Sequence, residues 1–294
     1  MVLYHRIAPE VPNQAGMVVD PDRFRRQLQA LRRHFDVLPA ADILRPSRRP
    51  TAAITFDDGY ADNLDVAAPV LRELGLPASL FIVTSALDED REFWWDRLEH
   101  ILLQRLEAEE ITVRVGPRLQ QLRLDDGNSR REALALLSRL LVRESPDGVE
   151  RTLDQLEALA GSAPAACARH RRLTRQQIVG LAADPLLEIG SHTCSHSALR
   201  RLPRAQCQKE LVASRHALRD VLGAAPRLLA YPYGAPGTVG RGDARRARAA
   251  GYDLAFVNVT GPTEHASPFA VPRIAVGEWE PDEFLTKITR WSSR

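Results

Sequence analysis

Two adjacent carboxylates, Asp57 and Asp58, stand directly after an apolar stretch and directly before a glycine. The stretch 52–56 reads as a buried strand, and burying ionised carboxylates without a cation or a hydrogen-bond donor costs several kcal/mol. Something positive is therefore expected beside the pair. The alternative is a solvated turn in which Asp58 caps a helix that begins near Asp62.

Two histidines four residues apart, His192 and His196, follow a second apolar run at 186–189. In a helical turn this spacing places both imidazoles on one face. Two neutral imidazoles and a carboxylate provide three protein ligands for Zn²⁺ or a similar divalent ion and leave a position open for water and substrate. A histidine pair of this spacing also occurs as surface decoration, so it is the combination with Asp57 and Asp58 that favours a metal site.

A third segment, Tyr231-Pro232-Tyr233-Gly234, is by itself read either as a Pro-Gly turn or as a strand end that enters a loop. Together with Thr55–Tyr60 and Ser191–His196 it resembles, in order and context, the polysaccharide deacetylases that share the NodB homology domain (carbohydrate esterase family 4). The resemblance covers roughly residues 1–96 and 172–294. It implies an α/β fold, namely a distorted, incomplete barrel of the (β/α)7 type with a mainly helical insertion.

The resemblance also implies a role for each matched residue. Asp57 matches the general base, while Asp58, His192 and His196 match the ligands of a divalent metal ion, for which Zn²⁺ is favoured over Co²⁺ or Ni²⁺. A backbone N–H at Tyr233 is implied as the donor to a tetrahedral oxyanion. The residue types suit this chemistry because a carboxylate can deprotonate a metal-acidified water, which then attacks an N-acetyl carbonyl.

The general acid is where the sequence departs from the common pattern of that family, because the late strand-like segment 269–276 contains no histidine. The opening residues instead resemble the circularly permuted branch that deacetylates poly-N-acetylglucosamine, which implies His5 as the acid. His5 is read alternatively as a half-buried histidine bonded to a neighbouring loop. His265, in a loop-like segment, is a weaker candidate.

A second departure concerns the arginine that, in the family, precedes the Pro-Tyr-Gly turn and orients the base. Ala230 occupies that position here. Arg273 could supply the guanidinium from another strand, because a bidentate arginine–carboxylate pair would keep Asp57 ionised. Arg273 is equally read as part of a salt bridge at the rim of the site.

The elements that must position these residues follow an alternation of strand and helix, which is typical of α/β folds. We expect strands at 2–5, 52–56, 79–84, 186–189, 228–231 and 254–259, and helices at about 21–35, 62–74 and 203–222. Each candidate catalytic residue then falls at the carboxyl end of a strand, where parallel α/β barrels build their sites.

The segment from about 97 to 171 breaks this alternation. It contains a plausible hairpin around Gly116-Pro117 and two leucine-rich helical runs near 131–142 and 149–159. We interpret it as an inserted helical cap beside the site, with a dimerisation surface as the alternative. The aromatic run Phe93-Trp94-Trp95 at its entry suits either a sugar face or a core that anchors the insertion.

Composition excludes some classes of function. With 40 basic and 38 acidic residues the net charge is +2, which gives no general argument for nucleic-acid binding. An apolar content of 44% suffices for the core of one catalytic domain spanning 1–294. Basic runs at 169–172 and 245–248 are read either as solvated helix faces or as a surface for an anionic substrate or a membrane.

Three cysteines, Cys167, Cys194 and Cys207, have no metal-type pair spacing, which argues against a disulfide framework and for a reducing compartment. No segment combines a basic start with a long apolar core, and none reaches the ~18 apolar residues of a membrane span. As it stands, the sequence predicts a cytoplasmic protein without a transmembrane segment, or an exported one if a leader has been removed. It leaves the oligomeric state open.

Three classes of function follow from these residues. The leading one is a metal-dependent hydrolase that removes N-acetyl groups from an N-acetylated sugar, in a polysaccharide or a glycan precursor, as a step of bacterial glycan biosynthesis. The second is a related hydrolase of the same fold that cleaves the C–N bond of a cyclic amide or a formamide. The third, a non-catalytic carbohydrate-binding relative, is disfavoured because both carboxylates and both histidines are intact.

Overall fold

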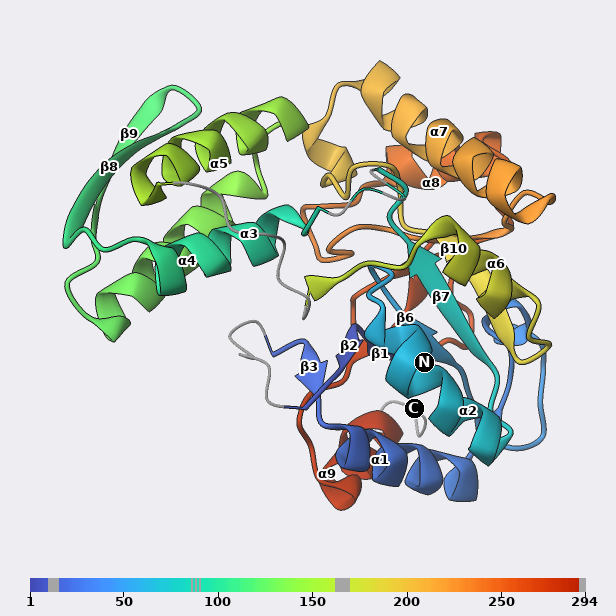
Figure 1. Ribbon diagram of the computed structural model, residues 1–294. Coiled ribbons are helices and arrows are strands. Elements are labelled where there is room, and N and C mark those ends of the chain that lie inside the picture. Colours follow the sequence, from blue (N-terminus) through green and yellow to red (C-terminus); the bar gives the residue numbers. More distant parts are fainter. Residues whose placement is uncertain (10–15, 86, 88, 90, 162–169, 291–294) are drawn as a thin grey trace. The chain divides into compact units, whose positions relative to one another are not determined.

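The computed structural model describes residues 1–9, 16–85, 87, 89, 91–161 and 170–290 (Figure 1). The chain divides into two compact units. The first combines Met1–Asp88 with Leu173–Arg294, and the second is Glu89–Arg172.

The first unit is built on a sheet of eight parallel strands in the order β13-β12-β11-β10-β7-β6-β1-β14. Figure 1 shows β1, β6, β7 and β10 side by side with helices outside them. The sheet is nearly closed, which confirms the predicted distorted (β/α) barrel. Its strands are β1 (Val2–Tyr4), β6 (Ile54–Phe56), β7 (Ala78–Ile82), β10 (Leu187–Ser191), β11 (Leu228–Ala230), β12 (Leu254–Val257), β13 (Val271–Pro272) and β14 (Ile274–Ala275).

One seam of the barrel lies between its two ends, β13 and β14, which are consecutive stretches of chain separated by Arg273 alone. β13 pairs with β12, and β14 pairs with β1. The Arg273 N–H donates to the carbonyl of Val257 at 3.0 Å, and the next N–H, of Ile274, donates to that of Met1 at 3.0 Å. β13 and β14 are therefore one continuous segment of chain that changes its partner strand at Arg273. The eight strands thus come from seven continuous segments.

Helix α1 (Pro21–His34) shows how the sequence sets an outer helix of the barrel. The Asp20 carboxylate caps its amino end by accepting the N–H groups of Asp22 at 2.9 Å and Arg23 at 3.2 Å, and Pro21 stands at the first helical position. Its apolar side chains Phe24, Leu28 and Leu31 are buried. In Figure 1 it lies beside α9 (Pro281–Thr289).

The helix predicted at about 62–74 begins differently from the prediction. Its first part, η2 (Asn63–Ala67), is a π-helix, in which the Ala68 N–H donates to the carbonyl of Asn63, and only α2 (Ala68–Leu74) is α-helical. Pro69 explains the wider turn, because it has no N–H for the α-helical bond and its ring would clash with the carbonyl four residues earlier.

Three further helices pack around the barrel: α6 (Arg175–Ala182), α7 (Arg204–Leu222) and α8 (Arg241–Ala249). Short pairings complete the unit, between β2 (Arg6–Ile7) and β3 (Val18–Val19), and between β4 (Asp36–Val37) and β5 (Thr51–Ala52). Short 3₁₀ turns lie at Ala40–Asp42 and Leu199–Arg201.

Two aromatic rings support the seam. Phe81 of β7 and Phe256 of β12 lie with their centroids 5.3 Å apart. The guanidinium carbon of Arg273 lies 5.4 Å from the Phe81 ring centroid and 6.0 Å from that of Phe256. The aromatic faces therefore stabilise a buried cation at this point of the barrel.

The second unit has its own apolar core. The predicted hairpin forms from β8 (Glu110–Val115) and β9 (Arg118–Arg123), and the predicted helices form as α4 (Gly127–Leu141) and α5 (Pro146–Ala160). Helix α3 (Trp94–His100) continues into the π-helix η3 (Ile101–Arg105). That residues 97–171 form an insertion within one catalytic domain remains our interpretation of the sequence.

The aromatic run at the start of the second unit is engaged within that unit. Phe93 stacks on Trp95 with ring centroids 4.5 Å apart, and Arg172 lies over the Phe93 ring at 4.8 Å. The nearby His170 Nδ1 lies 2.9 Å from a carboxylate oxygen of Asp96. Residues at the beginning and the end of the unit thus contact each other, which favours the anchoring interpretation of these aromatics.

Cys194 and Cys207 are free thiols, and Cys167 lies outside the described residues. In the described part of the chain, no helix has both the length and the apolar character needed to cross a membrane.

Candidate active site

Asp57 and Asp58 lie in the turn that follows β6, and both are buried. The Asp57 N–H donates to the carbonyl of Tyr4 on the neighbouring β1 at 3.1 Å. Asp58 has φ of 75°, in the left-handed region that residues other than glycine rarely adopt. Such strain persists only where surrounding contacts impose it, and it clusters at functional sites.

Arg273 makes a two-bonded ion pair with Asp57. Its two terminal nitrogens donate to the two carboxylate oxygens of Asp57 at 2.7 Å each, and one of them also donates to the Thr55 hydroxyl at 3.3 Å. The side chains are 0% and 1% exposed. The pair is therefore an interior one, and the alternative of a rim salt bridge does not apply.

Asn258, directly after β12, was missed by the sequence analysis. Its side-chain oxygen accepts a hydrogen bond from Arg273 at 2.7 Å, and its side-chain nitrogen donates to the Tyr233 carbonyl at 3.0 Å. Gly234 permits this contact, because a Cβ there would lie 2.5 Å from the Asn258 backbone nitrogen. The available signal was a polar residue at the carboxyl end of a predicted strand.

The expectation that His192 and His196 share a helical turn is wrong. They lie in an irregular loop after β10, in which Thr193 and His196 have φ of 65° and 56°. The loop still brings the rings together, with centroids 4.9 Å apart. The His192 Nδ1 is bonded to the Ala230 carbonyl at 2.8 Å, which leaves its Nε2 directed at the carboxylates.

Asp58, His192 and His196 form a group of ligand atoms that could hold a metal ion. One carboxylate oxygen of Asp58 lies 3.5 Å from His192 Nε2 and 3.4 Å from His196 Nε2. Ligand atoms about 2.0–2.1 Å from a tetrahedral Zn²⁺ are about 3.3–3.4 Å apart. The donor types and these two separations therefore fit a divalent cation.

The protonation states suit such a site. Burial lowers the pKa of His192, and burial together with the neighbouring His192 lowers that of His196 well below the ordinary value, so both imidazoles are neutral at pH 7. Burial alone would raise the pKa of Asp57, but Arg273 and His192 outweigh it and lower this pKa to about 2. Asp57 is therefore ionised across the physiological range.

The remaining predicted residues lie as follows. Tyr233, in the turn after β11, has φ of 61°, and its ring lies edge-on to His196 with centroids 4.7 Å apart. His5 follows β1 and is partly buried, and its carbonyl accepts a hydrogen bond from Asn63 at 2.9 Å. Its imidazole is near enough to influence the pKa values of Asp57 and His196. His265 is exposed in its loop.

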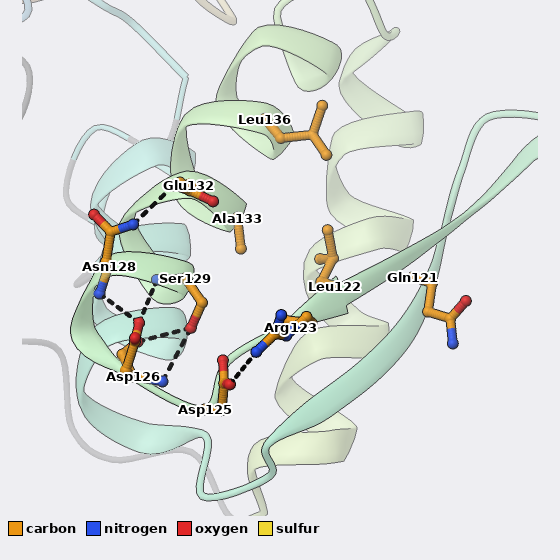
Figure 2. A pocket seen from close by; sticks show the side chains of 10 residues that line it. All are labelled: Gln121, Leu122, Arg123, Asp125, Asp126, Asn128, Ser129, Glu132, Ala133 and Leu136. Carbon is orange, nitrogen blue, oxygen red and sulfur yellow. Dashed lines mark hydrogen bonds and ion pairs between the residues drawn. The ribbon is translucent and has the colours of Figure 1, made fainter.

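A separate pocket in the second unit, between β9 and the start of α4, has a different character (Figure 2). The Asp126 carboxylate caps α4 by accepting the N–H groups of Asn128 and Ser129. Asp125 pairs with Arg123, and Asn128 donates to Glu132 at 2.8 Å. These polar groups are engaged in holding local structure, so this pocket is not the candidate active site.

A curated protein resembles part of this chain in sequence. YxkH of Bacillus subtilis (strain 168), whose assigned name is that of a polysaccharide deacetylase, is 27% identical over 77 residues, which are 25% of this chain and 28% of that protein. The chain thus spans little more than a quarter of this curated relative.

Two solved structures share the fold over nearly the whole chain. The Streptococcus pyogenes deacetylase PplD in complex with acetate is 17% identical with a TM-score of 0.62, covering 98% of this chain and 96% of PplD. IcaB from Ammonifex degensii is 17% identical with a TM-score of 0.59, covering 100% of this chain and 96% of IcaB.

The family described as polysaccharide deacetylase matches residues 45–115 and 146–255, which are more than half of the chain. The matched residues include both carboxylates, both histidines and the Tyr233 turn. They exclude His5 and Arg273. This chain therefore belongs to the polysaccharide deacetylase family.

Proposed function

We propose that this protein removes N-acetyl groups from an N-acetylated sugar, in a polysaccharide or a glycan precursor, with a divalent metal ion. The observation that carries the proposal is that the ligand set of Asp58, His192 and His196 adjoins the buried pair of Asp57 and Arg273. A set of two imidazoles and one carboxylate is typical of catalytic zinc sites, so Zn²⁺ is proposed ahead of Co²⁺ or Ni²⁺.

When bound, such an ion supplies Lewis-acid chemistry, because it acidifies water and polarises a carbonyl oxygen. The protein's own base is Asp57, whose carboxylate lies 3.7 Å from His192 Nε2 and so borders the ligand set. Asp57 accepts the proton of the attacking water. Arg273 keeps it ionised and fixes the direction of its oxygens, at the expense of basicity.

Two residues act on the substrate in this proposal. The backbone N–H of Tyr233 donates to the oxygen that becomes negative when the acetyl carbonyl is attacked. His5 gives a proton to the departing amine. Burial lowers the pKa of His5 to about 4 against the opposing influence of the Asp57 carboxylate, so the free protein holds a neutral imidazole at pH 7. The acid role requires that the pKa of His5 rise in the substrate complex.

In this proposal the chain forms one catalytic domain, into which residues 97–171 are inserted. The likeness in fold to a deacetylase solved with acetate, the product of deacetylation, supports acetyl as the acyl group that is transferred to water. The resemblance of the first residues to deacetylases of poly-N-acetylglucosamine makes that polymer the first substrate to examine.

The test is acetate release from N-acetylglucosamine oligomers by metal-stripped protein to which Zn²⁺, Co²⁺ or Ni²⁺ is returned. We expect no turnover without metal and acetate release after its return, with the Asp58→Ala variant inactive under both conditions. Formamides and cyclic amides serve as competing substrates. Turnover of these in preference to every N-acetylated oligomer, or full turnover by the metal-stripped protein, would refute the proposal.

A further inference from the structure

Glu210 is a buried carboxylate of α7 that takes no part in the proposed chemistry. It is 8% exposed. One of its oxygens accepts the backbone N–H groups of Cys194 at 3.0 Å and Ser195 at 2.8 Å, and the other accepts the Ser195 hydroxyl at 2.8 Å. No arginine or lysine forms an ion pair with Glu210 in the described part of the chain. The hydrogen-bond donors to its carboxylate all come from one loop.

That loop is the one that carries His192 and His196. Its backbone is strained at two positions, Thr193 and His196, both in the left-handed region. A loop of this kind does not hold its shape through local preferences, because each such residue costs of order 1–3 kcal/mol. The contacts that impose its shape must come from neighbouring elements.

Those contacts divide between two sides. The segment after β7 binds the carbonyls, since the N–H groups of Thr84 and Ser85 donate to Thr193 at 3.1 Å and Cys194 at 2.7 Å. Helix α7 binds the N–H groups, through Glu210. Ser214, one turn further along the same face of α7, bonds to the hydroxyl of Ser191 at 2.7 Å and so holds the point where the loop begins.

We propose that Glu210 is a positioning residue of the metal site: its carboxylate holds the loop of residues 192–196 in the one shape in which His192 and His196 face Asp58. The inference deepens the proposed function and rests on it for the presence of the metal. Groups that orient metal ligands commonly contribute about 10- to 100-fold to metal affinity. Helix α7 therefore contributes to the metal affinity of the site, although it supplies none of the metal ligands.

The chemistry of the side chain defines two informative variants. Glu210→Ala removes every acceptor and leaves the N–H groups of Cys194 and Ser195 without this partner. Glu210→Gln keeps one oxygen for those N–H groups, and its amide N–H₂ can donate to the Ser195 hydroxyl, which is able to reverse its role. If hydrogen-bond geometry is what matters, glutamine rescues the site and alanine does not.

The matched control is Cys207→Ala. Cys207 is buried on the same helix, one turn before Glu210, and its thiol contacts the carbonyls of Leu199 and Leu202 rather than the histidine loop. This variant removes a buried side chain of α7 without removing a contact to the histidine loop. It therefore reports what a general weakening of the helix does to the site.

The first measurement is the Zn²⁺ dissociation constant of full-length protein by competition with a chelator. We expect Glu210→Ala to bind Zn²⁺ roughly 10- to 100-fold more weakly than wild type, Glu210→Gln to stay within about threefold, and Cys207→Ala to match wild type even where its thermal midpoint falls. Equal affinity of wild type and Glu210→Ala overturns the inference, as does an equal loss in Cys207→Ala.

The second measurement uses metal-free protein, so that the inference and the proposed function fail separately. Amide hydrogen exchange of Cys194 and Ser195 should be at least tenfold faster in Glu210→Ala than in wild type or Cys207→Ala. Unchanged exchange overturns the inference whatever the metal does. If wild type and His192→Ala bind Zn²⁺ equally, the proposed metal site fails, and the exchange rates alone then decide whether Glu210 holds the loop.

Discussion

Arg273 and Asp57, which are 216 positions apart in the sequence, form a buried ion pair through two hydrogen bonds of 2.7 Å. Arg273 stands at the seam of the barrel, between β13 and β14, and Asp57 stands at the end of β6. The residue at the seam of the sheet is therefore also the one that pairs with the proposed base and lowers its pKa. Losing either partner would leave an uncompensated charge in the interior.

The variant Arg273→Gln is expected to shift the acid side of the pH–rate profile upward. Burial raises the pKa of Asp57, and Arg273 with His192 lowers it to about 2. Without the guanidinium, burial prevails and the carboxyl binds a proton at higher pH. Because the base must be ionised, kcat/KM declines on the acid side as Asp57 is protonated. At saturating metal, we expect the pH of this decline to be about one unit or more higher in the variant than in wild type.

Arg273→Lys is the control, since it keeps the charge without the two-bonded geometry and should shift the profile less. Stability follows the same sign. A carboxyl with a depressed native pKa contributes stability above its unfolded pKa of about 3.9 and loses it as the pH falls toward about 2. Arg273→Gln should flatten the unfolding free energy over that interval. An acid limb and an unfolding curve both identical to wild type would contradict this account.

The variant Asp57→Asn is expected to lose turnover while keeping its metal. Asparagine matches the shape of aspartate but cannot accept the proton of water, and Asp58, His192 and His196 remain to bind the ion. The rate constant kcat should fall by about 10²–10⁴-fold, with unchanged metal content by elemental analysis. Turnover at the wild-type rate would remove Asp57 from the role of base.

The variant His196→Ala is expected to lose the metal. It removes one of three ligand atoms, whereas His265→Ala removes an exposed imidazole outside the ligand group and serves as its control. Metal content of purified, dialysed protein should fall to a small fraction in the first variant and stay at the wild-type level in the second. Equal metal content in both variants would mean that the ion binds elsewhere.

The variant His5→Ala is expected to lower kcat by about 10²–10⁴-fold with the metal retained, because the departing amine would lack its proton. An acetylated arylamine has a leaving group that needs less protonation, so its hydrolysis should suffer much less than that of an N-acetylated sugar. If both substrates slow by the same factor, His5 supports the site rather than donating the proton. Wild-type kcat on the sugar would place the acid at another residue.

Much of the architecture could be predicted because each element carries a local pattern. The strands that end at Phe56 and Ala230 were recognisable as short apolar runs, and α1 by the spacing of its apolar residues. Both errors, at the start of the helix after Asp62 and in the histidine loop, concern backbone shapes that Pro69 and the surrounding contacts impose. Local patterns do not report such shapes.

The sequence by itself determined the residue types and the strand ends at which they stand, since parallel strands place their carboxyl ends together. The tertiary structure alone decided which of them meet. Arg273 reaches Asp57 because the chain changes partner strand there, Asn258 joins Arg273 to the Tyr233 turn, and Glu210 holds a loop from a separate helix. Periodicity shows which face of an element is buried, but the partner across the core depends on register and packing between distant elements.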